Sequence, residues 1–115
     1  MALPGILRLP RRQFLLVKFS GNPVRQKHFS ALVKRRSPSG FKPNRYSVVV
    51  SSKVHRLAVK RNQLRRLIYQ ELSQRTLSLF LDMIIYPQKS MLNLTHAEIS
   101  HEIDTFVSAL VAQKP

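Results

Sequence analysis

The hydrophobic pattern changes its period twice in the middle of the chain, and this constrains the fold more than any other feature. Residues 45–51 are rich in β-branched and aromatic side chains, which is typical of a strand. From about Ala58 to Gln74 apolar residues recur every three to four positions, which indicates an amphipathic helix. Leu79 to Tyr86 form a second apolar run, which Pro87 ends. A strand, a helix and a strand in this order predict a crossover unit.

Weaker signals place the elements that precede this unit. Residues 1–10 hold two prolines and predict an extended lead-in, and Arg11 to Phe19 predict a short helix ended by turn residues 20–23. His28 to Lys34 has strand character, and residues 35–44 indicate a hairpin loop into the next strand.

The last part of the chain predicts a helix from Thr95 to Ala112. Thr95 and Glu98 have the spacing of a capping box, in which each side chain bonds to the backbone N–H of the other residue. The expected buried stripe comprises Ile99, Ile103, Phe106, Leu110 and Val111. Together the elements predict the α+β class.

Length and composition favour one folded unit. The chain has 115 residues and is 43% hydrophobic, enough for a modest core but too short for a second domain. We therefore expect residues 1–115 to form a single domain. The chain has no cysteine, which excludes disulfide bonds and thiolate metal sites.

Positive charge is concentrated in the first part of the chain. The formal net charge is +15 and the pI about 11.6, which favours a polyanionic partner. Residues 1–70 hold 17 of the 20 Lys and Arg and no Asp or Glu, whereas the rest holds three basic and five acidic residues. Because this asymmetry lies within one domain, we expect a binding surface rather than a charged tail.

A membrane partner is disfavoured. No stretch approaches the roughly 18 apolar residues of a spanning helix, and Arg8, Arg11 and Arg12 interrupt the N-terminal segment. Pro4 and Pro10 are incompatible with the amphipathic helix of a mitochondrial presequence. We expect a cytoplasmic protein that acts neither on a membrane nor on a small-molecule substrate.

One face of the predicted middle helix suits RNA. At about 100° per residue, an arc of roughly 140° contains Arg61, Asn62, Arg65, Arg66 and Tyr69. Arginine bonds phosphate in a bidentate way and stacks on exposed bases, and asparagine adds a neutral donor and acceptor. The alternative is a solvated polar face, but such faces usually mix charge signs, and the chain has no acid before Glu71. We interpret the face, with the adjacent Lys60, as a binding surface.

Two segments of the middle third form a more specific pattern. Residues 45–54 read Arg-Tyr-Ser-Val-Val-Val-Ser-Ser-Lys-Val, and residues 58–68 read Ala-Val-Lys-Arg-Asn-Gln-Leu-Arg-Arg-Leu-Ile. The pattern resembles the signature of the bacterial ribonuclease P protein component family, in which a strand ending in Val-Ser-Lys-Lys precedes Ala-Val-x-Arg-Asn-Arg-x-Lys-Arg on a helix. The resemblance extends more loosely over the rest of the chain.

This resemblance implies a subunit of a ribonucleoprotein whose catalytic RNA, with bound Mg²⁺, removes the 5′ leader of precursor tRNA. By position, the implied RNA-binding residues are Lys53, Lys60, Arg61, Asn62, Arg65, Arg66 and Tyr69. The implied partners are ribonuclease P RNA and precursor tRNA. The protein itself is expected to supply no catalytic residue, metal ligand or cofactor, and Mg²⁺ is expected with the RNA.

The resemblance also implies a cleft between the first helix and the sheet, where the single-stranded leader lies. Phe14 would line this cleft and stack on bases without sequence preference. We assign to the same cleft Arg11, Arg12, Phe29 and Tyr46. For Phe14 and Phe29 a core position is the alternative, because aromatic residues in a chain of this size are usually core residues.

The expected fold is a single α+β domain of the order αβββαβα, with a mixed central sheet, a split βαβ crossover and a C-terminal helix. The resemblance implies a left-handed crossover, against the usual right-handed rule.

Three positions depart from the family pattern: Gln63, Tyr69 and Ser52 stand where family members commonly carry cations. Tyr69 can still stack and Gln63 can still bond a phosphate. Fewer cationic contacts nevertheless predict a shallower salt dependence of RNA binding.

The remaining polar residues predict no chemistry. His96 and His101 lack further ligands, so we interpret both as surface residues, and the five carboxylates form no paired acid/base or two-metal site. A structural rRNA-binding ribosomal protein is the alternative function, since it would share the size, pI and fold class. A DNA-binding domain is disfavoured because helix-turn-helix and zinc-finger spacings are absent from the sequence.

Overall fold

The computed structural model describes residues 9–35, 44–75 and 81–112, which fold as one α+β unit. The helices in these ranges are α1 (Arg11–Ser20), α2 (Ala58–Ser73) and α3 (His96–Ala112), with a 3-10 turn, η2 (Lys89–Asn93). The strands are β1 (Asn22–Arg25), β2 (Phe29–Arg35), β3 (Arg45–Val48) and β4 (Leu81–Pro87). The predicted order αβββαβα is confirmed, although the sequence pattern had located only two of the three strands that precede α2.

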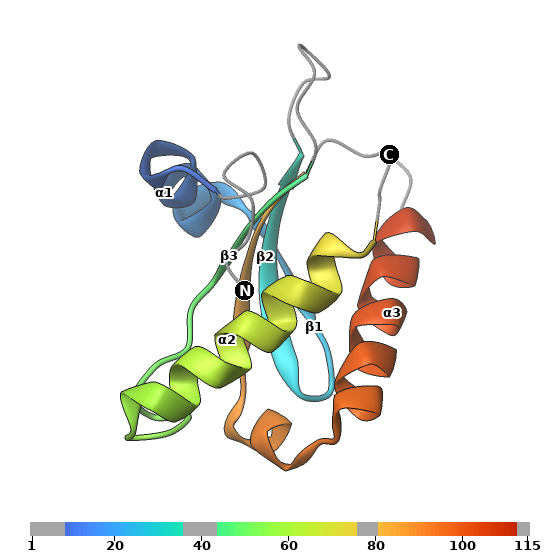
Figure 1. The fold of residues 1–115 in the computed structure, drawn as a ribbon. Coiled ribbons are helices and arrows are strands. Elements are labelled where there is room, and N and C mark those ends of the chain that lie inside the picture. Colours follow the sequence, from blue (N-terminus) through green and yellow to red (C-terminus); the bar gives the residue numbers. More distant parts are fainter. Residues whose placement is uncertain (1–8, 36–43, 76–80, 113–115) are drawn as a thin grey trace.

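The strands form a mixed sheet in the order β1-β2-β4-β3. β2 is antiparallel to β1 and to β4, whereas β3 and β4 are parallel. Residues 81–85 of β4 are all buried because β4 is central and both of its faces are covered, and all of them except Asp82 are apolar. Helices α2 and α3 cover one face of the sheet, and α1 lies on the other (Figure 1).

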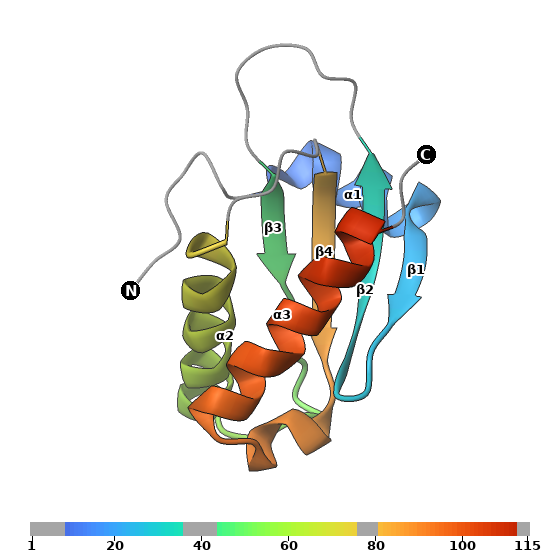
Figure 2. The ribbon, with the colours of Figure 1, turned by 90° about the vertical axis from the view of Figure 1, so that its right-hand side faces the viewer.

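The connection from β3 through α2 to β4 is left-handed. Figure 2 looks onto the face of the sheet that α2 and α3 cover; β3 runs downward, α2, drawn to the left of β3, runs upward, and β4 lies to the right of β3. A right-handed connection would place β4 on the left. The fold therefore has the left-handed crossover that the family resemblance implied.

The main core lies between the sheet and helices α2 and α3. Phe29 of β2 and Phe106 of α3 meet edge to face, with ring centroids 5.2 Å apart. Within the described side chains, the predicted α3 stripe is buried at Ile99, Ile103, Phe106 and Leu110, while the side chain of Val111 lies outside them. The capping box is also confirmed: Thr95 N–H donates to Glu98 Oε1 (2.8 Å), and Glu98 N–H donates to Thr95 Oγ1 (3.1 Å).

A smaller apolar contact holds α1 on the opposite face. Val17 is fully buried there, and Ile84 of β4 is fully buried outside the main core. The chain turns from α1 into β1 at Gly21, where a Cβ atom would lie 2.6 Å from the carbonyl oxygen of Val17. Only glycine fits this close approach.

Two expectations about the strands are wrong. The turn expected at residues 20–23 instead leads into β1, which pairs with β2 and tolerates Pro23 because β1 is an edge strand. The hairpin expected across residues 35–44 does not form, because β4 lies between β2 and β3 and pairs with both. Residues 36–43 themselves lie outside the described ranges.

Some predicted ends also shift. The strand predicted to reach Ser51 ends at Val48, although Val49 N–H still donates to Ile85 O (2.9 Å). Most of the predicted lead-in is outside the described residues; Leu9 N–H donates to Tyr46 O (3.0 Å). No helix in the described part of the chain is both long and apolar enough to cross a bilayer.

Candidate nucleic-acid interface

Helix α2 begins with cations at the positive end of its own dipole. Leu57 precedes the helix without a side-chain cap, and the first turn contains no acidic residue. Cations such as Lys60 destabilise this end of a helix by about 0.3–1 kcal/mol each, because unpaired N–H groups there already carry partial positive charge. The same arrangement favours a bound phosphate. The cations at the start of α2 therefore destabilise the helix slightly but favour the binding of a polyanionic ligand.

The loop before α2 is held in place by Arg61. Its Nη1 donates to the carbonyl oxygens of His55 and Arg56, both at 2.9 Å, and Leu57 N–H donates to His55 Nδ1 at 3.0 Å. The other three guanidinium N–H groups are on Nε and Nη2, enough for a bidentate phosphate contact. Arg61 thus fixes the backbone of the loop that also carries Lys53.

All seven predicted RNA-binding residues lie on α2 or its preceding loop, and six of them form a polar surface there. We call this set the α2 basic surface: Lys53, Lys60, Arg61, Asn62, Arg65 and Arg66. Arg61 and Arg65 are half-buried and the other four are exposed. Arg65 Nη1 donates to Asn62 Oδ1 at 2.5 Å, which orders these two neighbours. Leu64, Ile68 and Leu72 are at most 5% exposed and pack into the core, as predicted for the apolar side of this helix.

The seventh residue, Tyr69, has a structural role. Its hydroxyl accepts the backbone N–H of Val48 at 3.0 Å, and its half-buried ring packs against the core. We therefore correct the predicted role of Tyr69: its ring packs between α2 and the end of β3 and is not free to stack on RNA bases. Exposed Arg56, in the loop held by Arg61, is a neighbour that the helical pattern did not identify because it lies outside the helix.

The acidic residues of the chain bond to partners away from the α2 basic surface. Glu71 and Asp104 bond Arg75, Asp82 pairs with Arg45, Glu98 caps α3, and Glu102 lies 3.5 Å from His28. All five acidic residues of the sequence are in this set. The positive potential at the start of α2 is therefore not offset by salt bridges of these kinds, which is the arrangement expected for a polyanion-binding face.

At its far end, α2 is joined to α3 by a charged cluster. Burial would raise the pKa of Glu71, but hydrogen bonds from His96, Ser100 and Arg75 outweigh burial and hold that pKa below its ordinary value. The hydrogen bond to Asp104 is the main cause that raises the pKa of Arg75. His96 is exposed, as predicted, yet its Nε2 lies 2.8 Å from Glu71 Oε2. This cluster fixes the direction of α2 relative to α3.

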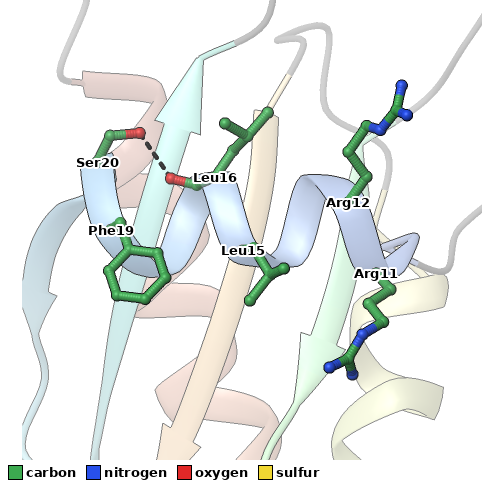
Figure 3. Close-up of a pocket in the computed structure, with 6 residues that line it drawn as sticks. All are labelled: Arg11, Arg12, Leu15, Leu16, Phe19 and Ser20. Carbon is green, nitrogen blue, oxygen red and sulfur yellow. Dashed lines mark hydrogen bonds between the residues drawn. The ribbon is translucent and has the colours of Figure 1, made fainter.

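The residues assigned to the leader cleft do not lie together in the structure, and the cleft itself stays a prediction. Phe29 is fully buried and Tyr46 is 4% exposed, both in the core beneath α2 and α3, where burial raises the pKa of Tyr46. Their assignment to the cleft is wrong because their side chains project to the opposite face of the sheet from α1. Phe14 of α1 is half-buried, consistent with either of the positions left open for it. Arg11 and Arg12 are exposed on the outer side of α1, beside Leu15 and Leu16 (Figure 3).

Residues missed by sequence reasoning lie on the α1 side of the sheet. Arg25 of β1, Ser30 of β2 and Tyr86 of β4 are register partners and form one row across three strands. Tyr86 is half-buried, and burial raises its pKa. The alternation of side chains along a strand could have identified Tyr86, because it is out of phase with Met83 and Ile85, which point into the main core.

The same face ends in a buried ion pair. Arg45 of β3 and Asp82 of β4 are register partners, and their side chains bond in a bidentate way: Nε to Oδ1 at 2.8 Å and Nη2 to Oδ2 at 2.7 Å. This pair stabilises the parallel pairing of β3 with β4. Among the described residues, no group of three or more His, Asp or Glu could hold a metal ion.

Comparisons with known proteins agree with this architecture. A family model described as Ribonuclease P matches residues 7–111. Among solved structures, the ribonuclease P protein of Thermotoga maritima has a TM-score of 0.74 and 21% identity, over 87% of this chain and 94% of that chain. That of Staphylococcus aureus has a TM-score of 0.75 and 20% identity, over 91% and 94%. A Staphylococcus aureus mutant described as having defective mRNA degradation activity has a TM-score of 0.76 and 19% identity, over 92% and 88%. No curated protein sequence matches.

Proposed function

The chain belongs to the Ribonuclease P family, and from this premise we propose that it is the protein subunit of a ribonuclease P ribonucleoprotein, whose RNA it binds through the α2 basic surface. One observation carries the proposal: cations gather at the uncapped start of α2 while the five acidic residues bond elsewhere. Fixed positive charge of this kind raises the affinity of an RNA for another polyanion and lowers its magnesium requirement. Magnesium and the cleavage chemistry belong to the RNA in this proposal.

The second part of the proposal concerns precursor tRNA. The single-stranded 5′ leader lies against the α1 side of the sheet, where Phe14 and Tyr86 offer aromatic rings and Arg25 offers a cation. Bases stack on aromatic side chains with little regard to sequence. Such contacts suit a subunit that serves leaders of many sequences.

Reconstitution tests the first part. The purified chain is mixed with a bacterial ribonuclease P RNA and precursor tRNA at limiting magnesium, and 5′ cleavage is measured. The double variant Arg65→Gln/Arg66→Gln should reduce stimulation by about tenfold or more, because it removes contacts to phosphate. The matched control, Lys27→Gln/Lys89→Gln, removes two exposed cations elsewhere and should keep full stimulation.

The outcomes separate the proposal from its alternatives. If the unaltered chain gives no stimulation over RNA alone, a ribosomal rRNA-binding role replaces the ribonuclease P role. If both double variants lose stimulation equally, the total charge of the protein causes the stimulation, and the α2 basic surface has no specific role.

Leader binding is tested by comparing the affinity of the reconstituted complex for precursor tRNA and for mature tRNA. Phe14→Leu and Tyr86→Leu keep apolar bulk but remove stacking, and should each lower the preference for the precursor about fivefold. Phe19→Leu is the matched control, because Phe19 is an aromatic residue on the outer side of α1. Loss of preference in the control alone would contradict the placement of the leader.

A further inference from the structure

The outer side of α1 carries an apolar surface that the ribonuclease P role does not use. Two rows with i,i+4 spacing run along it, Arg11, Leu15 and Phe19 in one and Arg12, Leu16 and Ser20 in the other (Figure 3). These six residues line a shallow hollow of about 620 Å³, and we call them the outer α1 surface. We propose that the outer α1 surface docks an acidic amphipathic helix of a partner protein.

Among the described residues, the outer α1 surface takes no part in the packing of the fold. α1 buries Val17 against the sheet, and at about 100° per residue Leu15 and Phe19 lie on the opposite side of the helix. Leu15 is 41%, Leu16 51% and Phe19 80% exposed. Scattered exposed leucines are normal, but three large apolar side chains within five residues of one helix form a continuous patch, which marks an interaction site.

Polar groups are distributed unevenly along the surface. Arg11 and Arg12 stand at its N-terminal end, where the first turn of α1 has no acidic residue and no side-chain cap. At the other end, the hydroxyl of Ser20 donates to the carbonyl oxygen of Leu16 at 2.6 Å and so is already satisfied. A complementary ligand is therefore anionic at one end and apolar along the rest of its length.

A second copy of this chain does not meet that requirement. The chain has a net charge of +15, and α1 contributes Arg11, Arg12 and Lys18 without an acid. Pairing α1 with another α1 would bring like charges together in an apolar contact, which is unfavourable.

A nucleic-acid strand fits less well than a helix. It carries a phosphate at every nucleotide and needs cations or donors along its whole path, whereas the segment from Leu15 to Ser20 lines the hollow with apolar atoms and one satisfied hydroxyl. The Lys18 ammonium already lies 5.9 Å from the centroid of the Phe19 ring, over which a base would have to stack. An amphipathic helix instead places apolar side chains between the two rows and carboxylates on the arginines.

The test uses a designed probe. A fluorescent 16-residue helical peptide carries leucines at i, i+3, i+4 and i+7 and glutamates at one end only; a control peptide has the same composition with the leucines scattered around the helix. The patterned peptide should bind saturably and about tenfold more tightly than the scattered one. Equal binding of both peptides, or no saturable binding of either, overturns the proposal.

Two pairs of variants locate the contact. Leu16→Ser should weaken binding about tenfold, whereas Leu57→Ser should not, although Leu57 is 49% exposed against 51% for Leu16. Arg12→Gln should weaken binding and flatten its salt dependence, whereas Lys27→Gln should not. Equal effects within either pair overturn the proposal, as does displacement of the peptide by an unstructured oligonucleotide whose own binding depends on Leu16.

The inference is independent of the ribonuclease P assignment. Leu16→Ser should keep full stimulation of ribonuclease P RNA, which also shows that the variant is folded. If it loses that stimulation and the helical circular dichroism of the native chain is intact, the outer α1 surface serves the RNA complex and the partner-protein proposal is wrong.

Discussion

Tyr69 of α2 accepts a hydrogen bond from the backbone N–H of Val48, the last residue of β3, at 3.0 Å. β3 is an edge strand, paired only with β4 within the described sheet, so one side of its backbone is left for other partners. The Tyr69 hydroxyl is such a partner, and its hydrogen bond fixes the end of β3 to α2. A residue in the arc expected to bind RNA therefore holds α2 on the sheet.

Replacing Tyr69 by phenylalanine should lower stability and leave RNA affinity unchanged. The change leaves the Val48 N–H without its partner in a partly buried place, at a cost of about 1–2 kcal/mol in the free energy of unfolding. Urea denaturation and a titration with ribonuclease P RNA measure the two effects. A drop in RNA affinity with unchanged stability would show that the hydroxyl faces RNA instead.

Arg61 and Arg66 should differ although they are close in sequence. Arg61→Gln removes two hydrogen bonds to loop carbonyls and should lower both stability, by about 1 kcal/mol, and RNA affinity. Arg66→Gln changes an exposed side chain and should lower RNA affinity alone. Equal stability losses in the two variants would contradict the role of Arg61 in holding the loop.

Gln63 offers a gain of function. It is exposed on α2, at a position where the family commonly has arginine. Gln63→Arg should add one phosphate contact and make the slope of log affinity against log salt steeper by about 0.7–0.9. Lys89→Arg, which keeps the charge of an exposed cation elsewhere, is the control. An unchanged slope in Gln63→Arg would mean that this position does not face RNA.

Periodicity was sufficient for α2 and α3 because each buries a stripe of apolar residues against the sheet. The predicted helix from Ala58 to Gln74 matches α2 to one residue, and the capping box placed the start of α3 correctly. β1 was missed because Asn22 and Pro23 are turn-forming types, and only its pairing with β2 makes them a strand.

The site residues failed where side-chain direction depends on register. Phe29 and Tyr46 were assigned to the leader cleft by resemblance and aromatic type, but a one-residue shift in phase exchanges the two faces of a strand. In β4 the strand period separates Tyr86 from Met83, but residues of both phases are buried, so the period alone could not show which phase faces α1 and which faces the main core. The charged side of α2 was predictable because only one side of that helix is apolar.

The Glu71 cluster should make stability fall at acid pH. Hydrogen bonds from His96, Ser100 and Arg75 outweigh burial and hold the pKa of Glu71 below its ordinary value of 4.5. A carboxylate with a lowered folded-state pKa contributes stability that is fully present above its unfolded pKa and is lost as pH falls through the folded pKa. The urea midpoint should therefore be level from pH 7 to about 5 and fall below about 4.5.

Glu71→Gln keeps an acceptor for Arg75 but cannot titrate, so its midpoint should start lower and fall less over the same range. Asp104→Asn is the comparison, since Asp104 bonds the same arginine from an exposed position and is screened by solvent. If Glu71→Gln fell as steeply as the unaltered chain, the acid sensitivity would arise from other carboxylates, and the cluster would not be what joins α2 to α3.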